Sequence, residues 1–125
     1  MKNSKQIKKA TLESIVYESF MKSPIPIAIT RADDGTYVEV NEAGIRYMGM
    51  KREDIIGRKS TELGMMTKEQ RQLFIDEIKK EGFARNIPLE VKIDDQVVQV
   101  LLAAYLFRRG NEDLLLCVLY SIGSY

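Results

Sequence analysis

The sequence contains no histidine, and its only cysteine is Cys117. The absence of histidine excludes His-ligated haem, histidine metal sites, Ser-His or Cys-His nucleophile pairs and a histidine phosphoacceptor. A single cysteine cannot form an internal disulfide, which makes a reducing compartment the natural expectation. We therefore expect a cytoplasmic protein whose function does not depend on imidazole chemistry.

Long apolar runs and an excess of one charge are also missing. No run approaches the roughly 20 apolar residues of a membrane-spanning helix, and the N-terminus lacks the apolar core and cleavage site of a secretory signal. Nineteen basic and eighteen acidic residues leave a net charge of +1, which gives no reason to expect a nucleic-acid partner. The N-terminal lysines are interpreted as a solvated lead-in. We expect neither a membrane span nor binding to nucleic acid.

The size and composition are those of one globular domain. The chain has 125 residues, of which 45% are hydrophobic and 30% charged, and a domain of this length hides roughly two-thirds of its unfolded surface. We predict a polar lead-in over residues 1–11, one domain over 12–122 and a short tail over 123–125.

The first third predicts a helix followed by a hairpin. Apolar residues recur at helical spacing from residue 12, and Pro24 ends the helix because the residue before proline disfavours helical dihedrals. Strands are predicted over 26–31 and 37–40, joined by a turn at Asp33-Asp34-Gly35. Alternation within the second strand places Val38 and Val40 on one face and directs Glu39 outward.

Short helices are predicted after this hairpin. Asn41 is suited to cap a helix whose C-terminal left-handed residue is Gly49. A further turn over residues 52–56 ends at Gly57. Thr67-Lys68-Glu69-Gln70 matches a capping box, which predicts a helix ending at Gly82.

The last third predicts three strands, over 87–93, 96–107 and 114–122. The last two are apolar on both faces, so both faces of the sheet need a cover. The helices between the second and third strands can cover one face, and the N-terminal helix, a partner chain or both can cover the other. The fold class is therefore α+β, a five-stranded antiparallel sheet with short helices packed on one face and an N-terminal amphipathic helix.

These elements, in this order, resemble the PAS sensor domain family found in bacterial sensor histidine kinases and related signalling proteins. The matching stretches are SPIPIAI at 23–29, DGTY at 34–37, VNEA at 40–43 and REDIIGR at 52–58. The resemblance implies a ligand pocket between the sheet and the short helices. Two features depart from the family. Ser121-Ile122-Gly123 replaces a common Asp-Ile-Thr-like triplet, and Cys117 lies within a strand, which argues against a flavin-cysteine adduct.

The implied pocket would be lined by aliphatic, aromatic and methionine side chains. Methionine is adaptable and suits variable apolar ligands, although a role as core filler remains open. Arg46 and Tyr47 could contact a ligand carboxylate. The candidate pocket residues are Ile27, Ile29, Tyr47, Met48, Ile56, Met65, Met66 and Phe74. No catalytic residue and no metal ligand is predicted, and the cofactor stays unassigned.

Three functions remain open. The first is a non-catalytic sensory module that passes a packing change to an output domain in cis or on a signalling partner. The second is a dimerisation module with a filled core, and the third is a small isomerase or hydratase, which would need a buried carboxylate facing a tyrosine across a cavity. A homodimer is expected in the first two. Its candidate interface residues are Leu12, Ile15, Val16, Phe20, Leu101, Tyr105 and Leu119.

Overall fold

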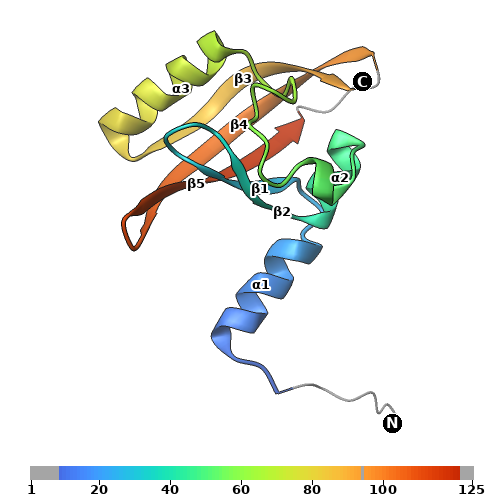
Figure 1. Ribbon diagram of the computed structural model, residues 1–125, viewed down its shortest axis with the longest axis vertical. Helices are drawn as coiled ribbons and strands as arrows, with labels where there is room; N and C mark the ends of the chain where they lie inside the picture. The colour runs from blue at the N-terminus through green and yellow to red at the C-terminus, as the bar shows by residue number, and fades with distance from the viewer. Residues whose placement is uncertain (1–8, 94, 122–125) are drawn as a thin grey trace.

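The computed structural model describes residues 9–93 and 95–121 of the chain. In chain order the elements are α1 (Leu12–Lys22), β1 (Ile27–Arg31), β2 (Tyr37–Val40), α2 (Glu42–Met48), the 3-10 turn η1 (Arg52–Asp54), α3 (Lys68–Glu81), β3 (Phe83–Ile93), β4 (Gln96–Arg109) and β5 (Glu112–Ser121). The strands form one antiparallel sheet in the order β2-β1-β5-β4-β3. Helices α2 and α3 cover the same face of this sheet (Figure 1). The predicted α+β fold class is confirmed.

The helix termini follow the predicted caps. The Asn41 side chain accepts from the Gly44 amide at the start of α2, and Gly49 ends that helix with a φ of 67°. Thr67 forms the capping box of α3, which Gly82 ends with a φ of 82°. Asn41 and Thr67 satisfy amides that a helix leaves free, and the glycines take the left-handed conformation that ends a helix, so the ends of α2 and α3 agree with the local sequence.

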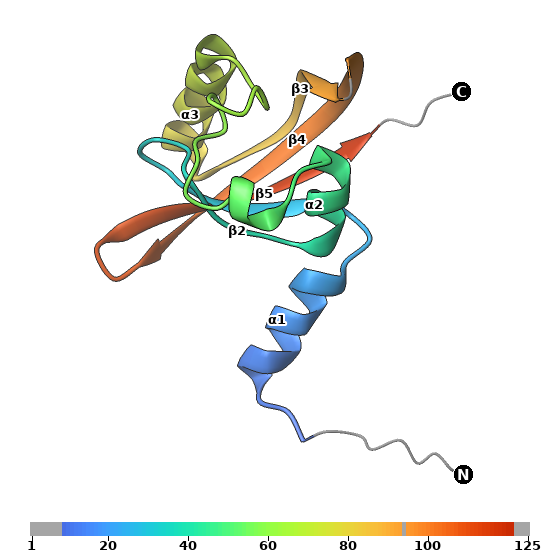
Figure 2. The ribbon, with the colours of Figure 1, turned by 45° about the vertical axis from the view of Figure 1, so that its right-hand side comes forward.

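Helix α1 forms as predicted but stands apart from the sheet. Thr11 caps it through the Ser14 amide, and no residue of the helix is buried. In both ribbon views the helix points away from the body of the domain (Figures 1 and 2). Within the single chain α1 therefore does not cover the outer face of the sheet.

A bulge changes which residues of β2 face inward. Ala28 pairs with Val40 and Ile29 with Glu39, but Thr30 pairs with Tyr37, so Val38 is an extra residue on β2. Tyr37 and Val40 are consequently the buried members of the strand, while Val38 is half-buried. The prediction that Val38 and Val40 share a face was wrong, because a bulge breaks the two-residue repeat.

β3 begins earlier than predicted, also because of a bulge. It starts at Phe83, and its pairing with β4 shifts between Ala84 and Ile87. Asn86 takes a left-handed φ of 56° there. Because of this interruption, the first residues of β3 do not continue the alternation of apolar and polar residues from which the strand was predicted. The hairpin of β4 and β5 also extends beyond the other strands (Figure 2).

The core lies between the inner face of the sheet and the α2 to α3 region. Its fully buried members include Val40, Ile55, Val100 and Leu115. Ile55 follows η1, so the segment between α2 and α3 contributes to the core rather than crossing open surface. The edge strand β2 is bordered by this segment, because Tyr37 exchanges backbone hydrogen bonds with Gly57 and Arg58. This segment and the sheet together enclose an internal cavity.

Candidate functional site

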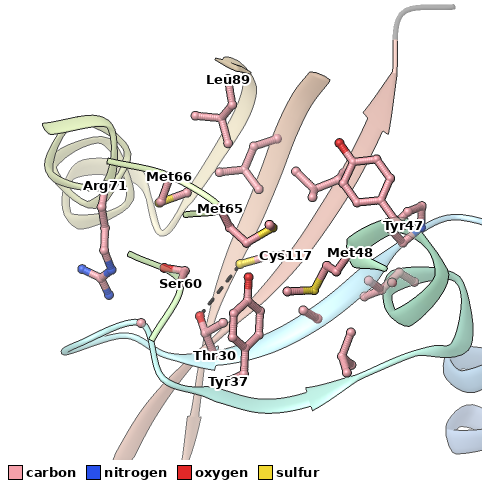
Figure 3. A pocket seen from close by; sticks show the side chains of 18 of the residues that line it. Thr30, Tyr37, Tyr47, Met48, Ser60, Met65, Met66, Arg71, Leu89 and Cys117 are labelled. Atoms are coloured by element: carbon pink, nitrogen blue, oxygen red, sulfur yellow. Dashed lines mark hydrogen bonds between the residues drawn. The ribbon is translucent and has the colours of Figure 1, made fainter. Parts of the chain in front are cut away.

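A cavity of about 60 Å³ lies between the inner face of the sheet, α2 and the loop before α3 (Figure 3). Its wall is mostly apolar, with hydroxyl and sulfur groups from the sheet and one arginine from α3. The lining residues include Thr30, Tyr37, Tyr47, Met48, Ser60, Met65, Met66, Arg71, Cys117 and Leu119. The cavity is less than half of the roughly 150 Å³ that holds a benzene molecule in an engineered protein core.

The structure brings most of the predicted pocket residues together. Ile27, Tyr47, Met48, Met65, Met66 and Phe74 line the cavity. Ile29 and Ile56 are not part of its wall. Ile29 pairs with Glu39 and Leu116 on the outer face, and the inward positions of β1 belong to Ala28 and Thr30. The two-residue repeat of the strand therefore turns the Ile29 side chain away from the cavity.

Several cavity residues were not predicted. Thr30, Tyr37, Ser60, Arg71 and Cys117 all contribute to the wall. The β2 bulge turns Tyr37 inward, and no local sequence pattern marks a bulge at that point. Cys117 was predicted to lie within a strand, and its register opposite Ala28 and Ala104 places it on the inner face. Arg71 lies in the first turns of α3, where its charge favours a solvated interpretation.

The thiol of Cys117 and the phenol of Tyr37 are held in their neutral forms. Burial raises the pKa of the Cys117 thiol to about 11, while a contact with the Thr30 hydroxyl at 4.0 Å has the opposite, smaller effect. The thiol keeps some accessible surface because it borders the cavity. Burial also raises the pKa of Tyr37. Both groups are protonated near neutral pH, so Tyr37 keeps its hydrogen-bond donor.

The hydroxyl of Tyr47 is buried and has no hydrogen-bond partner among the described residues. Burial raises the pKa of this phenol as well. Tyr47 also borders a second hollow beside Pro24, Ile25 and Tyr120. The side chain therefore separates the cavity from the linker that joins α1 to β1.

Arg71 marks the opposite end of the cavity. Its side chain descends from α3 beside Ser60, far from Tyr47 (Figure 3). One terminal nitrogen, Nη2, donates to the carbonyl oxygen of Ala32 at 2.8 Å and more weakly to that of Arg31 at 3.4 Å. Arg71 also borders an outer cleft between α3 and the hairpin of β4 and β5. It is thus the boundary between the internal cavity and this cleft.

Asn41 connects the linker before β1 to the start of α2. It is fully buried, and its side-chain oxygen accepts from the amides of Ile27 at 3.0 Å and Gly44 at 2.8 Å. Its amide nitrogen donates to the Ile25 carbonyl at 2.9 Å. The predicted cap therefore also binds both sides of the linker.

The predicted interface residues lie on different surfaces. Leu12, Ile15 and Val16 are more than half exposed on α1, and Phe20 is half-buried near its end. Leu101 and Tyr105 lie on the outer face of the sheet, opposite Tyr120 and Leu116 of β5. Leu119 does not, because it pairs with Leu102 on the inner face and lines the cavity.

Within residues 9–93 and 95–121 the structure holds no cluster of three or more potential metal ligands from cysteine, aspartate or glutamate. No described helix has the length and apolar character needed to cross a membrane. Among the described residues that line the cavity there is no aspartate or glutamate.

Comparisons with known proteins agree with this geometry. Among solved structures, the chain is similar to the PAS domain of an HTR-like protein from Haloarcula marismortui, with a TM-score of 0.73, 24% identity and coverage of 88% of this chain and 91% of that one. It is also similar to the PAS domain of nitrogen regulation protein NR(II) from Vibrio parahaemolyticus, with a TM-score of 0.70, 10% identity and coverage of 90% and 100%. For the PAS domain of Bordetella pertussis BvgS the TM-score is 0.66, the identity 11% and the coverage 90% and 87%. At these identities the likeness establishes the fold.

A search of the curated proteins found no match. The model of the PAS domain family matches residues 24–122, which is most of the chain and includes the whole sheet and the cavity. By this match, the chain belongs to the PAS domain family.

Proposed function

We propose that this PAS domain is a non-catalytic sensory module that binds a small ligand and passes a packing change to an output domain outside the chain. The observation that supports this proposal is the internal cavity, which has a mostly apolar wall and, in Tyr47, a buried hydroxyl without a hydrogen-bond partner among the described residues. PAS domains are commonly sensory signalling modules. The free thiol and the absence of disulfides suit a cytoplasmic location.

Two wall elements lead out of the cavity to the ends of the domain. Pro26 and Ile27 line it at the start of β1, next to the linker that Asn41 holds. Cys117 and Leu119 line it on β5, the last strand. A ligand that moved these side chains would act directly on the connection to α1 and on the C-terminal strand. Deletion of residues 1–22 should therefore abolish the response of a full-length parent, and an unchanged response would exclude the route through α1.

A dimerisation module with a filled core is the second candidate. It is favoured by the small volume of the cavity and by the apolar outer face, where Phe107 remains 53% exposed. Exposed apolar patches of this kind often mark interaction surfaces. An enzymatic role has less support, because the described cavity wall lacks the carboxylate that a hydratase or isomerase would place opposite a tyrosine.

Native mass spectrometry of freshly purified protein separates the first two candidates. A non-covalent adduct that is lost on denaturation supports ligand sensing, whereas a dimer of the bare chain mass supports interaction alone. A protein that is monomeric at high micromolar concentration by sedimentation would contradict the homodimer in both.

The outer face can be tested separately from α1. Replacing Leu101 and Tyr105 with glutamate puts two charges on the half-buried outer surface of β4 and should weaken a dimer formed there. Gln99→Glu is a matched control, because Gln99 is exposed on the same face of the same strand. Equal dissociation constants for the double variant and the control would exclude this face.

A further inference from the structure

The charge of Arg71 has no carboxylate partner among the described residues. None of the ion pairs in residues 9–93 and 95–121 includes Arg71. The acidic residues that act on the Arg71 charge, Asp33 and Asp34, belong to the turn between β1 and β2, and Arg31 binds both of them. It lies 3.0 Å from Asp33 and 3.8 Å from Asp34.

Backbone contacts satisfy only part of the Arg71 guanidinium. Nη2 donates to the carbonyl of Ala32, whereas Nε and Nη1 have no acceptor among the described residues. Burial lowers the pKa of this guanidinium, and the attraction of Asp34 and Asp33, which form no ion pair with Arg71, offsets only part of the lost hydration. A half-buried cation with free N–H groups is suited to bind an anion that enters the cavity.

Ser60 and the Gly35 backbone complete the polar end of the cavity. A Cβ atom at Gly35 would lie 2.7 Å from Arg71 Nε and 3.0 Å from Ser60 Oγ, so these two polar atoms converge on the glycine. Ser60 is a buried residue that lines the cavity, and its hydroxyl forms no hydrogen bond to a described residue. Arg71 and Ser60 thus offer several unused donors on one side of the cavity.

The rest of the cavity wall disfavours cationic ligands and large ligands. The described lining residues include no acidic side chain, so a ligand cation would find no counter-charge. Tyr37, Cys117 and Met65 provide a neutral and mostly apolar surface beyond the polar end (Figure 3). A volume of about 60 Å³ is too small for a ligand of six heavy atoms such as butyrate unless the flexible methionines of the wall move aside, so binding should displace Met65 and Met66 and larger acids should be excluded.

We propose that the cavity binds a short-chain monocarboxylate, with its carboxylate at Arg71 and Ser60 and its alkyl chain between Tyr37, Met65 and Cys117. The proposal rests on the ligand-sensing function proposed above and names its ligand class. Arg71 also borders the outer cleft, so the anion would enter past this side chain. Arg46, the cation considered from the sequence, is exposed and not part of the wall.

The first test compares sodium butyrate with butyramide, a neutral molecule of nearly the same shape. Titration into the full chain is followed by the methyl signals of the methionines in NMR spectra and by calorimetry. We expect butyrate to shift signals of Met65 and Met66 and to bind at least tenfold more tightly than butyramide, as a charge-assisted hydrogen bond predicts. Equal affinity, or no shift of cavity methyl signals by butyrate, would overturn the proposal.

The second test uses Arg71→Met, which keeps an unbranched apolar chain and removes the charge. Butyrate affinity should fall on the order of ten- to hundredfold, while Arg71→Lys should retain part of it. Arg46→Met removes an exposed arginine outside the cavity and should leave affinity unchanged. A loss of the same size in Arg46→Met would contradict the assignment. If Arg71→Met does not fold, the comparison of butyrate with butyramide in the native chain still tests whether the cavity binds a monocarboxylate.

The two proposals can fail independently. If native mass spectrometry reveals a bound molecule that is not a carboxylate, and butyrate does not shift the cavity signals, ligand sensing stands and the monocarboxylate is excluded. If neither a bound molecule nor butyrate binding is found, both proposals fail.

Discussion

Asn41 shows how one side chain can hold three segments. Its side chain joins β1, α2 and the linker after α1 through hydrogen bonds to Ile27, Gly44 and Ile25. The sequence predicted only that Asn41 caps α2, because a cap depends on the Asn41 side chain and the three residues that follow it. The contacts with Ile25 and Ile27 cross 16 and 14 positions, and no local pattern reports them.

Asn41→Ala should destabilise the domain by about 3 kcal/mol, since it removes a helix cap and leaves buried backbone groups unsatisfied. Thr67→Ala is the control. It removes an exposed cap of α3 and should cost only about 1 kcal/mol. Urea unfolding of both variants measures the difference, and equal losses would show that the linker contacts contribute nothing.

Gly35 and Gly57 form a matched pair at the residue scale. Both have a left-handed φ, of 79° and 86°, but an added Cβ meets Arg71 and Ser60 at Gly35 and nothing within 4 Å at Gly57. Each alanine variant carries backbone strain of roughly 1–2 kcal/mol. Gly35→Ala should lose roughly 1–3 kcal/mol more, because Arg71 must move. Equal melting temperatures for the two variants would contradict the close approach of Arg71.

At the scale of the elements, the sequence predicted capped helices well and bulged strands poorly. Caps and helical periodicity act over a few residues, so α1, α2 and α3 were found near their observed ends. The bulges in β2 and β3 depend on pairing with other strands, which local sequence does not report. The first bulge turns Val38 away from the inner face, and the second breaks the alternation at the start of β3, so that this start was not predicted. The same non-local register decides which side chains reach the cavity.

Helix α1 provides the test at this scale. Because Ile15 is 51% exposed and makes no buried contact in the single chain, Ile15→Lys should change stability of the monomer by no more than about 0.5 kcal/mol. If the apolar stripe of α1 (Leu12, Ile15, Val16 and Phe20) forms the dimer interface, the same variant should weaken dimerisation at least tenfold. Burial of a charged lysine in an apolar interface costs free energy.

Glu18→Lys is the control for α1, since residue 18 lies on the side of the helix away from the apolar stripe. Sedimentation velocity at several concentrations measures both variants. If Ile15→Lys and Glu18→Lys sediment as the parent protein does, the stripe is not the interface.

On the scale of the whole molecule, the fold and the position of the cavity followed from the order of elements, while its chemistry did not. Apolar strands and capped helices were sufficient to predict a sheet with helices on one face. Arg71 and Ser60 reach the cavity from α3 and from the loop before it, and their approach is set by packing across the β1 to β2 turn. Sequence spacing carries no information about that approach.

Stability should decrease with increasing pH above the ordinary range of thiol ionisation. The pKa of Cys117 is about 11 in the folded chain and about 8.5 in an unfolded one. Between these values the unfolded chain releases its proton first, so stabilisation that is complete below about pH 8.5 is lost as pH approaches 11. Burial of Tyr37, whose pKa is also raised, adds to the loss at still higher pH.

The contribution of the thiol is isolated by Cys117→Ser. The difference in unfolding free energy between the parent and this variant, measured by denaturant titration from pH 7 to 10.5, should shrink as pH rises. A difference that stays constant over this range would show that the thiol ionises equally in the folded and unfolded chain.

The isolation of α1 has a consequence for how the domain reports association. A helix of 11 residues without a buried side chain is shorter than the roughly 12–15 residues at which isolated helices become marginal in water. Docking on a partner surface should therefore stabilise the helix, and the ordering of α1 becomes part of the binding free energy. Coil-to-helix conversion, visible in backbone amide exchange of residues 12–22, would itself be the signal that a partner has arrived.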